Sequence, residues 1–158
     1  MKIQKTNAMR MLDRAKIPYE IFTYEVDESD LSGTHVAMDV GLPYSQVFKT
    51  LVAKGDKTGY VVFVIPVDKE IDLKAAAVAS NNKRVEMIAV KDLLSVTGYI
   101  RGGCSPVGMK KQFPTYFDAS VKNHDCIAVS AGVRGCQLFL DCDKLIEFTK
   151  AEIKEVIR

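Results

Sequence analysis

The feature that most restricts the fold is a pair of apolar runs, residues 47–53 and 60–67, separated by a short GDKTG segment at 55–59. Both runs are rich in β-branched and aromatic residues, and the segment between them consists of turn-forming residues, so we expect an antiparallel β-hairpin. Residues 60–67 are also the longest apolar run, and they include Pro66. A membrane span needs about 20 apolar residues, so we expect no contact with a membrane.

The other turn-forming and helix-capping residues predict short helices and strands in one domain. Thr6 is suited to cap a first helix that ends before Pro18, and Gly41 and Gly98 are placed to stop two later helices. Helices are expected at 34–40, 72–80, 91–97 and from about 143; strands at 19–25, 84–89, 126–130 and 137–141, with a loop and room for a short strand at 99–111. Hairpins mixed with helices predict an α+β fold around a mixed, mainly antiparallel sheet. No repeat or linker divides the chain, so we expect a single domain over 1–158.

Composition restricts function only weakly. The chain has 22 Lys and Arg against 20 Asp and Glu, and a net charge of +2 neither indicates nor excludes nucleic-acid binding. Its four cysteines are 22, 10 and 6 positions apart and form no zinc motif with the two histidines. We therefore expect free thiols, no metal and no cofactor. The N-terminus lacks the apolar segment of a signal peptide, which predicts a cytoplasmic protein.

Lys49 is the first residue that could carry chemistry. Strand alternation places its side chain on the same face as Val47 and Leu51, where an ammonium is unusual. One interpretation is an edge-strand lysine whose stem packs while its head reaches water. The other is a cation held on a rigid element to bind an anion, most plausibly a phosphate.

The second candidate is the segment 98–111, which has four glycines and a proline within its first eleven residues. Successive amides in such a loop can converge on an anion or on the oxygen of a tetrahedral intermediate, although a wide surface turn would use the same residues. A P-loop is excluded because Met109 precedes Lys110 and no hydroxyl follows for magnesium.

The third candidate is the segment 129–135, in which Ser130 ends a predicted strand and glycines follow. It is not a Gly-x-Ser-x-Gly motif and no histidine is placed to act as a base, so covalent serine catalysis is disfavoured. Cys104, beside Arg101, could act as a nucleophile, but a small buried apolar role is the favoured interpretation. The two histidines, His35 and His124, are interpreted as surface or capping residues.

Taken together, FKTL at 48–51, TGY at 97–99 leading to GGCSPVGMKK at 102–111, and VSAGVRG at 129–135 resemble the YbaK/EbsC family of aminoacyl-tRNA deacylases. The resemblance covers nearly the whole chain. It implies a free-standing relative of the editing domain of prolyl-tRNA synthetases, with a partly barrel-like sheet and flanking helices. The implied reaction is hydrolysis of the ester that joins a wrong amino acid, typically cysteine, to tRNA(Pro).

The resemblance also implies roles for individual residues. Those at the reacting centre are Lys49, Gly102, Gly103 and Ser130; those contacting the substrate are Tyr24, Leu31, Ser105, Pro106, Gly132 and Gln137; those contacting tRNA are Lys110, Lys111 and Arg134. Lys49 would lie near the terminal adenosine and its phosphate, and the glycine pair would line the carbonyl. Two positions depart from the family pattern: Gln137 replaces an aspartate that some members carry, and a pocket phenylalanine is matched only by Leu31 or Ser32.

An aminoacyl ester is already activated, so an enzyme must chiefly hold its carbonyl, stabilise the oxyanion and admit a nucleophile. No strong base is visible, which suits a route in which the thiolate of the cysteinyl group attacks its own carbonyl. Broader deacylation of alanyl or seryl esters, and a non-catalytic module that binds tRNA or a synthetase, are alternatives. The expected partners are the acceptor end of tRNA(Pro) and, in a ternary complex, prolyl-tRNA synthetase; the sequence does not indicate an oligomeric state.

Overall fold

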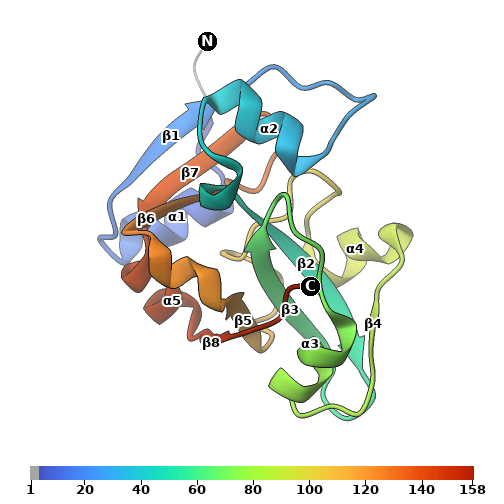
Figure 1. Cartoon of the computed structure of the whole chain (residues 1–158). Coiled ribbons are helices and arrows are strands. Elements are labelled where there is room, and N and C mark those ends of the chain that lie inside the picture. Colours follow the sequence, from blue (N-terminus) through green and yellow to red (C-terminus); the bar gives the residue numbers. More distant parts are fainter. Residues whose placement is uncertain (1–3) are drawn as a thin grey trace.

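The computed structural model describes residues 4–158 as an α+β fold with two open sheets, neither of which closes into a barrel (Figure 1). The three-stranded sheet has the order β1 (Tyr19–Thr23), β7 (Cys136–Asp141), β6 (Cys126–Ser130). The five-stranded sheet has the order β4 (Val85–Met87), β2 (Phe48–Gly55), β3 (Gly59–Pro66), β5 (Thr115–Asp118), β8 (Glu152–Lys154). Pairing is mostly antiparallel, which confirms the predicted fold class.

The predicted hairpin is the centre of the larger sheet. β2 and β3 pair along their whole length, from Phe48 opposite Pro66 to Gly55 opposite Gly59. The other edge of β2 is paired only at its far end, where residues from Ala53 onward face β4. Just before β2, Val47 forms an isolated parallel bridge to Ala128 of β6, which joins the two sheets. The first half of β2 therefore has a free edge next to the smaller sheet.

Five α-helices begin and end close to the predicted signals. They are α1 (Asn7–Arg14), α2 (Gly33–Val40), α3 (Leu73–Ala79), α4 (Val90–Thr97) and α5 (Cys142–Thr149), with 3₁₀ turns η1 (Tyr44–Gln46) and η2 (Ala119–Asn123). Thr6 caps α1 by accepting the N–H of Met9, and Gly41 and Gly98 end α2 and α4 in the left-handed conformation. Among the described residues, no helix is long and apolar enough to cross a membrane.

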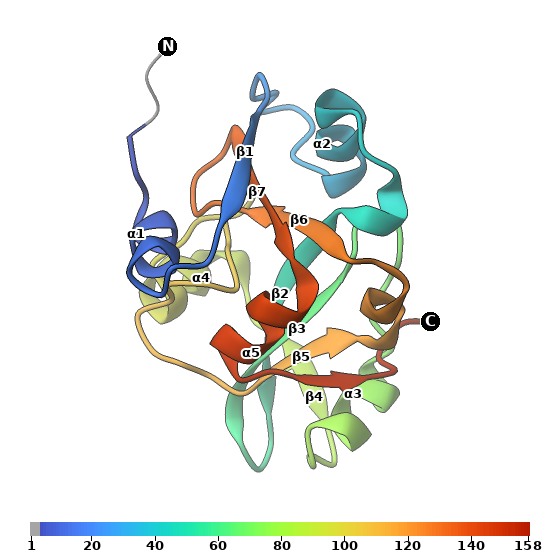
Figure 2. The same cartoon turned by 90° about the vertical axis from the view of Figure 1, so that its left-hand side faces the viewer.

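The main core lies between the two sheets. One face of β2 and β3 packs against the inner faces of β6 and β7, and α1 and α5 close the same core from outside. Its largest fully buried members include Phe48, Phe117, Met9, Leu138 and Leu145. Figure 2 shows α1 and α5 on this side of the molecule.

Two smaller cores position the elements that surround the free edge of β2. On the outer face of the larger sheet, Phe63 and Ile65 pack under Ala76 of α3. At the junction of the sheets, Ala37 of α2 packs with Val47 and other buried residues. Helix α2 is thus attached beside the start of β2.

Two strands, β5 and β8, were not predicted from the sequence. Both are short and make parallel pairs, β3 with β5 and β5 with β8, between segments far apart in the chain. Parallel pairs have no hairpin turn between them, so local sequence offers no signal for them. β8 also follows the helix that was expected to be the last element, and segment 99–111 forms turns rather than a strand.

The carboxylate of Asp118 links the two unpredicted strands and generates a stability prediction. It is 2% exposed, accepts the N–H and the hydroxyl of Ser120, and accepts the N–H of buried Val156. Replacing Asp118 with Ala leaves that amide unpaired and removes the cap of η2, so we expect the free energy of unfolding to fall by about 2–4 kcal/mol. Urea denaturation measures this. Asp143→Ala, at an exposed first-turn position of α5, is the control and should cost under about 1 kcal/mol; equal losses in both variants would contradict the assignment.

Candidate active site

A pocket of about 390 Å³ surrounds the free edge of β2. Its volume lies in the range of small-molecule sites. Its walls come from residues 47–52, the N-terminal end of α2 with the preceding loop, the β4–α4 connection, the loop at 101–104 and the facing positions of β6 and β7. Most of the wall is aliphatic, with Val36, Val52, Ile88 and Leu93 as examples. We call this the β2-edge pocket.

Lys49 lies on the wall of the β2-edge pocket, opposite Ile65 of β3. It is half-buried on the predicted face of the strand, where Leu51 packs against the outer core. Burial lowers the pKa of Lys49, and the nearby carboxylates of Glu70 and Asp68 partly oppose that effect. Within residues 4–158 its ammonium forms no ion pair, and the side chain of Glu70 instead pairs with Arg158 at 3.2 Å. The cation is therefore available to a ligand.

A single aromatic ring positions the two glycine-containing loops. Tyr99 is buried and donates its hydroxyl to the carbonyl of Val107 at 2.6 Å. A Cβ at Gly132 would lie 2.9 Å from the Tyr99 ring, and one at Gly108 would lie 2.6 Å from its hydroxyl. Both glycines also have positive φ, so no other residue fits without strain. The loop at 99–108 and the loop at 131–135 consequently both pack against the side chain of Tyr99.

The predicted glycine pair separates into two different roles. Gly103 donates its N–H to Ile100 at 2.9 Å, closing a turn in which Gly102 has φ 86°. The amide of Gly103 is therefore already engaged, and its Cα packs against the backbone of Val133 and Arg134. Gly102 lies on the pocket wall, and neither its N–H nor that of Cys104 bonds to another residue within 4–158. The amides of Gly102 and Cys104 are therefore candidates for binding an oxyanion.

Ser130 and Gln137 face each other across β6 and β7 and both line the β2-edge pocket. Each is more than nine-tenths buried. Ser130 accepts the N–H of Gly132 at 3.2 Å, whereas Oε1 of Gln137 has no partner among the described residues. The hydroxyl of Thr50, also on the wall, is buried and equally without a partner. Sequence reasoning missed Thr50, whose only signal was its place beside Lys49.

The structure brings only some of the predicted residues to this pocket. Leu31, Lys49, Gly102, Ser130 and Gln137 line it. The predicted residues that do not line it are Tyr24, Gly103, Ser105, Pro106, Gly132, Lys110, Lys111 and Arg134. Their proposed contacts with substrate or tRNA stay predictions.

Three of these residues have other positions or contacts in the structure. Ser105 is fully buried and accepts the N–H of Val107. Arg134 donates from Nε to the carbonyl of Arg101 at 2.8 Å, which ties the two loops together. Lys110 is exposed, and the stem of its side chain lies close to Gly98.

Cys104 also lines the pocket, and burial raises the pKa of its thiol to about 12. A thiol with that pKa is protonated near neutral pH and is a poor nucleophile. This agrees with the interpretation of Cys104 as a small apolar wall residue. All four cysteines are free thiols, as expected.

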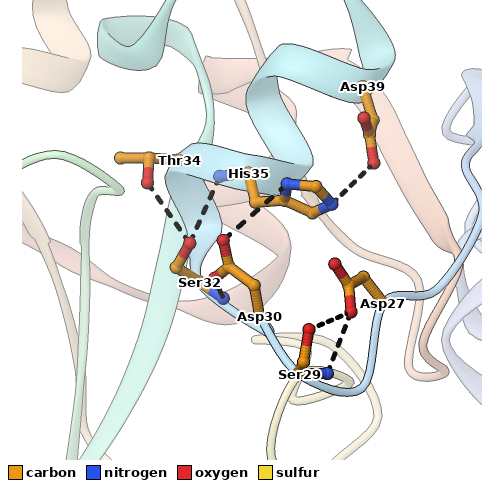
Figure 3. A network of polar contacts seen from close by, with 7 residues as sticks. All are labelled: Asp27, Ser29, Asp30, Ser32, Thr34, His35 and Asp39. Carbon is orange, nitrogen blue, oxygen red and sulfur yellow. Dashed lines mark hydrogen bonds and ion pairs between the residues drawn. The ribbon is translucent and has the colours of Figure 1, made fainter.

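The loop before α2 is ordered by its own polar side chains, and His35 belongs to this network rather than to the pocket (Figure 3). His35 lies 3.2 Å from Asp39 and 3.8 Å from Asp30. Asp30 also accepts the N–H of Ser32, and Ser32 in turn caps α2. These contacts agree with the surface or capping role expected for His35, and they fix the segment that carries Leu31 and Ser32 to the pocket wall.

Comparison with known proteins identifies the family of this chain. Residues 32–148 match the model of the aminoacyl-tRNA editing domain. The chain belongs to this family. It is 50% identical to EbsC of Enterococcus faecalis over 97% of this chain and 93% of that protein, for which a Cys-tRNA(Pro)/Cys-tRNA(Cys) deacylase activity is proposed. The uncharacterised protein YwhH of Bacillus subtilis is 25% identical over 82% of each chain.

Solved structures support the editing-domain fold. A protein proposed as a trans-editing enzyme for prolyl-tRNA synthetase superposes with a TM-score of 0.86 at 19% identity, covering 100% of this chain and 99% of the other. The protein APE2540 gives a TM-score of 0.87 at 18% identity, covering 97% and 100%. At these identities the likeness concerns the fold alone.

The partial burial of Cys104 predicts slow alkylation of its thiol. Since the pKa of Cys104 is raised from 9.0 to about 12, its thiolate fraction at pH 8 should fall about a thousandfold. We expect iodoacetamide to modify Cys104 of the folded editing domain far more slowly than in denaturant, as followed by peptide mass spectrometry. Rapid modification of Cys104 in the native protein would contradict a buried, protonated thiol.

Proposed function

We propose that this editing-domain chain cleaves the ester of mischarged tRNA in trans, with Cys-tRNA(Pro) as its main substrate. The observation that carries the proposal is the presence of a half-buried, unpaired Lys49 and a free Gly102 amide on the walls of one pocket. Family membership and the activity proposed for EbsC supply the reaction class.

Lys49 is suited to hold the phosphate of the terminal adenosine. Its ammonium forms no ion pair within residues 4–158, and it stands on a strand that packs on both faces. A rigid point charge of this kind fixes the position of a phosphate without reading a sequence. The ester that joins the aminoacyl group to the ribose is then held inside the β2-edge pocket.

The amides of Gly102 and Cys104 are suited to stabilise the oxyanion. Attack on the carbonyl carbon moves negative charge onto its oxygen, and donors that are already in place lower that barrier. The C–O bond to the ribose then breaks, and the 3′ oxygen takes a proton. Gly103, whose N–H is engaged in the turn, acts by setting the shape of this loop.

The thiol of the cysteinyl group is the proposed nucleophile. The pocket wall includes no carboxylate or histidine that could serve as a general base, and the thiol of Cys104 is protonated. In the substrate-assisted route the substrate thiolate forms a C–S bond to its own carbonyl, the ester C–O bond breaks, and a thiolactone leaves. Prolyl esters lack a thiol and therefore cannot react by this route. Pocket size alone would discriminate between two substrates by only about 1–3 kcal/mol per methylene.

The proposed partners are the acceptor end of tRNA(Pro) and prolyl-tRNA synthetase. With a net charge of +2 the chain can neutralise few phosphates, so a partner that selects the tRNA would be useful. The exposed Lys110 and Lys111 remain candidates for backbone contacts.

Replacing Lys49 tests the site itself. We expect Lys49→Ala to lower kcat/KM for cysteinyl-tRNA(Pro) by about 100-fold or more, because the phosphate loses its cation. Lys54→Ala is the matched control, since Lys54 lies on the same strand but is exposed at its far end. Both variants should melt close to the unaltered protein. Equal and negligible rates for the unaltered protein and Lys49→Ala would favour a non-catalytic binding module.

Comparing esters on one tRNA tests the nucleophile. If the substrate thiol attacks, cysteinyl-tRNA(Pro) should be cleaved at least about 100-fold faster than the alanyl and seryl forms, because only cysteine carries a thiol. Single-turnover deacylation assays measure the three rates. Similar rates for all three esters would point to water as the nucleophile and to a broader deacylase.

A further inference from the structure

Two oxygen atoms in the β2-edge pocket lack the partners that buried polar groups normally have. Among the described residues, Oγ1 of Thr50 and Oε1 of Gln137 are the buried side-chain oxygens without a hydrogen bond. The hydroxyls of Thr115 and Thr149, by contrast, donate to backbone carbonyls. A buried polar atom left unpaired destabilises a fold, so a pair of them on one pocket wall indicates groups kept for a ligand.

The charges around this pocket limit what that ligand group can be. The titratable or permanently charged side chains on the wall are Lys49 from β2 and Arg101 and Cys104 from the loop after α4. Burial keeps Cys104 neutral, and the wall includes no carboxylate. Asp68 and Glu70 act on Lys49 from outside the wall. An ammonium entering the pocket would meet Lys49 and Arg101 on the wall and no carboxylate to pair with, which is unfavourable at low dielectric.

We propose that the hydroxyl of Thr50 and the amide of Gln137 bind the α-amino group of the aminoacyl ester in its neutral form; this inference rests on the proposed deacylase function. A neutral amine offers two N–H donors and one lone pair. A hydroxyl and a primary amide each both donate and accept, so together they match this set. A carboxylate at position 137 would only accept, and it would favour the ammonium instead. Thr50 and Gln137 are thus binding residues that select the protonation state of the substrate.

A stability comparison tests whether the two side chains are uncommitted to the fold. In the ligand-free protein, Thr50→Val should keep or raise the Tm, by up to about 2–4 °C, because an unpaired buried hydroxyl is removed. Thr115→Val is the matched control and should lower the Tm, since its hydroxyl bonds to Phe113 at 3.0 Å. Gln137→Met should likewise be tolerated, whereas Gln46→Met should destabilise because Gln46 donates to Cys126 at 3.0 Å.

A pH profile tests the ligand group. The kcat/KM of the unaltered protein for cysteinyl-tRNA(Pro) should rise with pH more steeply than the substrate thiol alone explains, because deprotonation of the amine adds about a tenfold rise per pH unit below the amine pKa, which for α-amino groups is about 8. The same tRNA carrying 2-hydroxy-3-mercaptopropionate keeps the thiol but lacks the amine, so its profile should lack that step. Thr50→Val and Gln137→Met should each lower kcat/KM for the cysteinyl ester about tenfold. Gln137→Glu should bind the ammonium and remove the amine-dependent step.

The outcomes separate this inference from the function on which it rests. Identical pH profiles for the two esters, or a loss of Tm in Thr50→Val as large as in Thr115→Val, would overturn the inference while leaving the deacylase assignment intact. Failure of the unaltered protein to cleave any ester at any pH would overturn both.

Discussion

The unpaired edge of β2 is the constraint from which the rest of the site follows. β2 is paired with β3 along its whole length but with β4 only from Ala53 onward, and the bridge from Val47 to Ala128 holds its beginning against the smaller sheet. A free edge inside a fold normally invites pairing or aggregation. Here α2, the β4–α4 connection and the two glycine-containing loops surround it and leave a pocket. Because the side chains of neighbouring strand residues point to opposite faces, Lys49 and Thr50 reach the same pocket from two sides.

The chemistry proposed for the pocket depends on polar groups of its wall that have no partner within the fold. The ammonium of Lys49 has no ion pair, the amides of Gly102 and Cys104 have no acceptor, and the oxygens of Thr50 and Gln137 have no donor within residues 4–158. Neighbouring groups are engaged within the fold: the N–H of Gly103 closes its turn, the hydroxyl of Ser105 accepts the N–H of Val107, and Nε of Arg134 donates to Arg101. The contrast between engaged and free groups supports our proposal that this pocket binds the substrate, and membership of the editing-domain family supports the proposed class of ligand.

Much of this could be predicted from the sequence because the signals were local. The hairpin was marked by its turn and alternation, the helix ends by Thr6, Gly41 and Gly98, and the site by the Lys49 motif and the glycine-rich segment. β5 and β8 were not predictable because parallel pairing between distant segments leaves no local pattern. The role of Gly103 was also hidden, since only coordinates show which of two adjacent amides closes a turn. Thr50 was overlooked because an unpaired hydroxyl is a property of its surroundings rather than of its position in the chain.

Tyr99 has a further consequence for how this scaffold can diversify. Its ring lies between the loop that contains Gly102 and the loop that follows Ser130, and a glycine from each loop packs closely against it. A shift of one loop would displace the other, so we expect insertions in either loop to be disfavoured. Relatives should therefore keep the relative position of the two loops. Relatives that acquire new preferences would be expected to do so by exchanging side chains on the wall, at positions such as 104 and 137, while the framework that carries them stays constant.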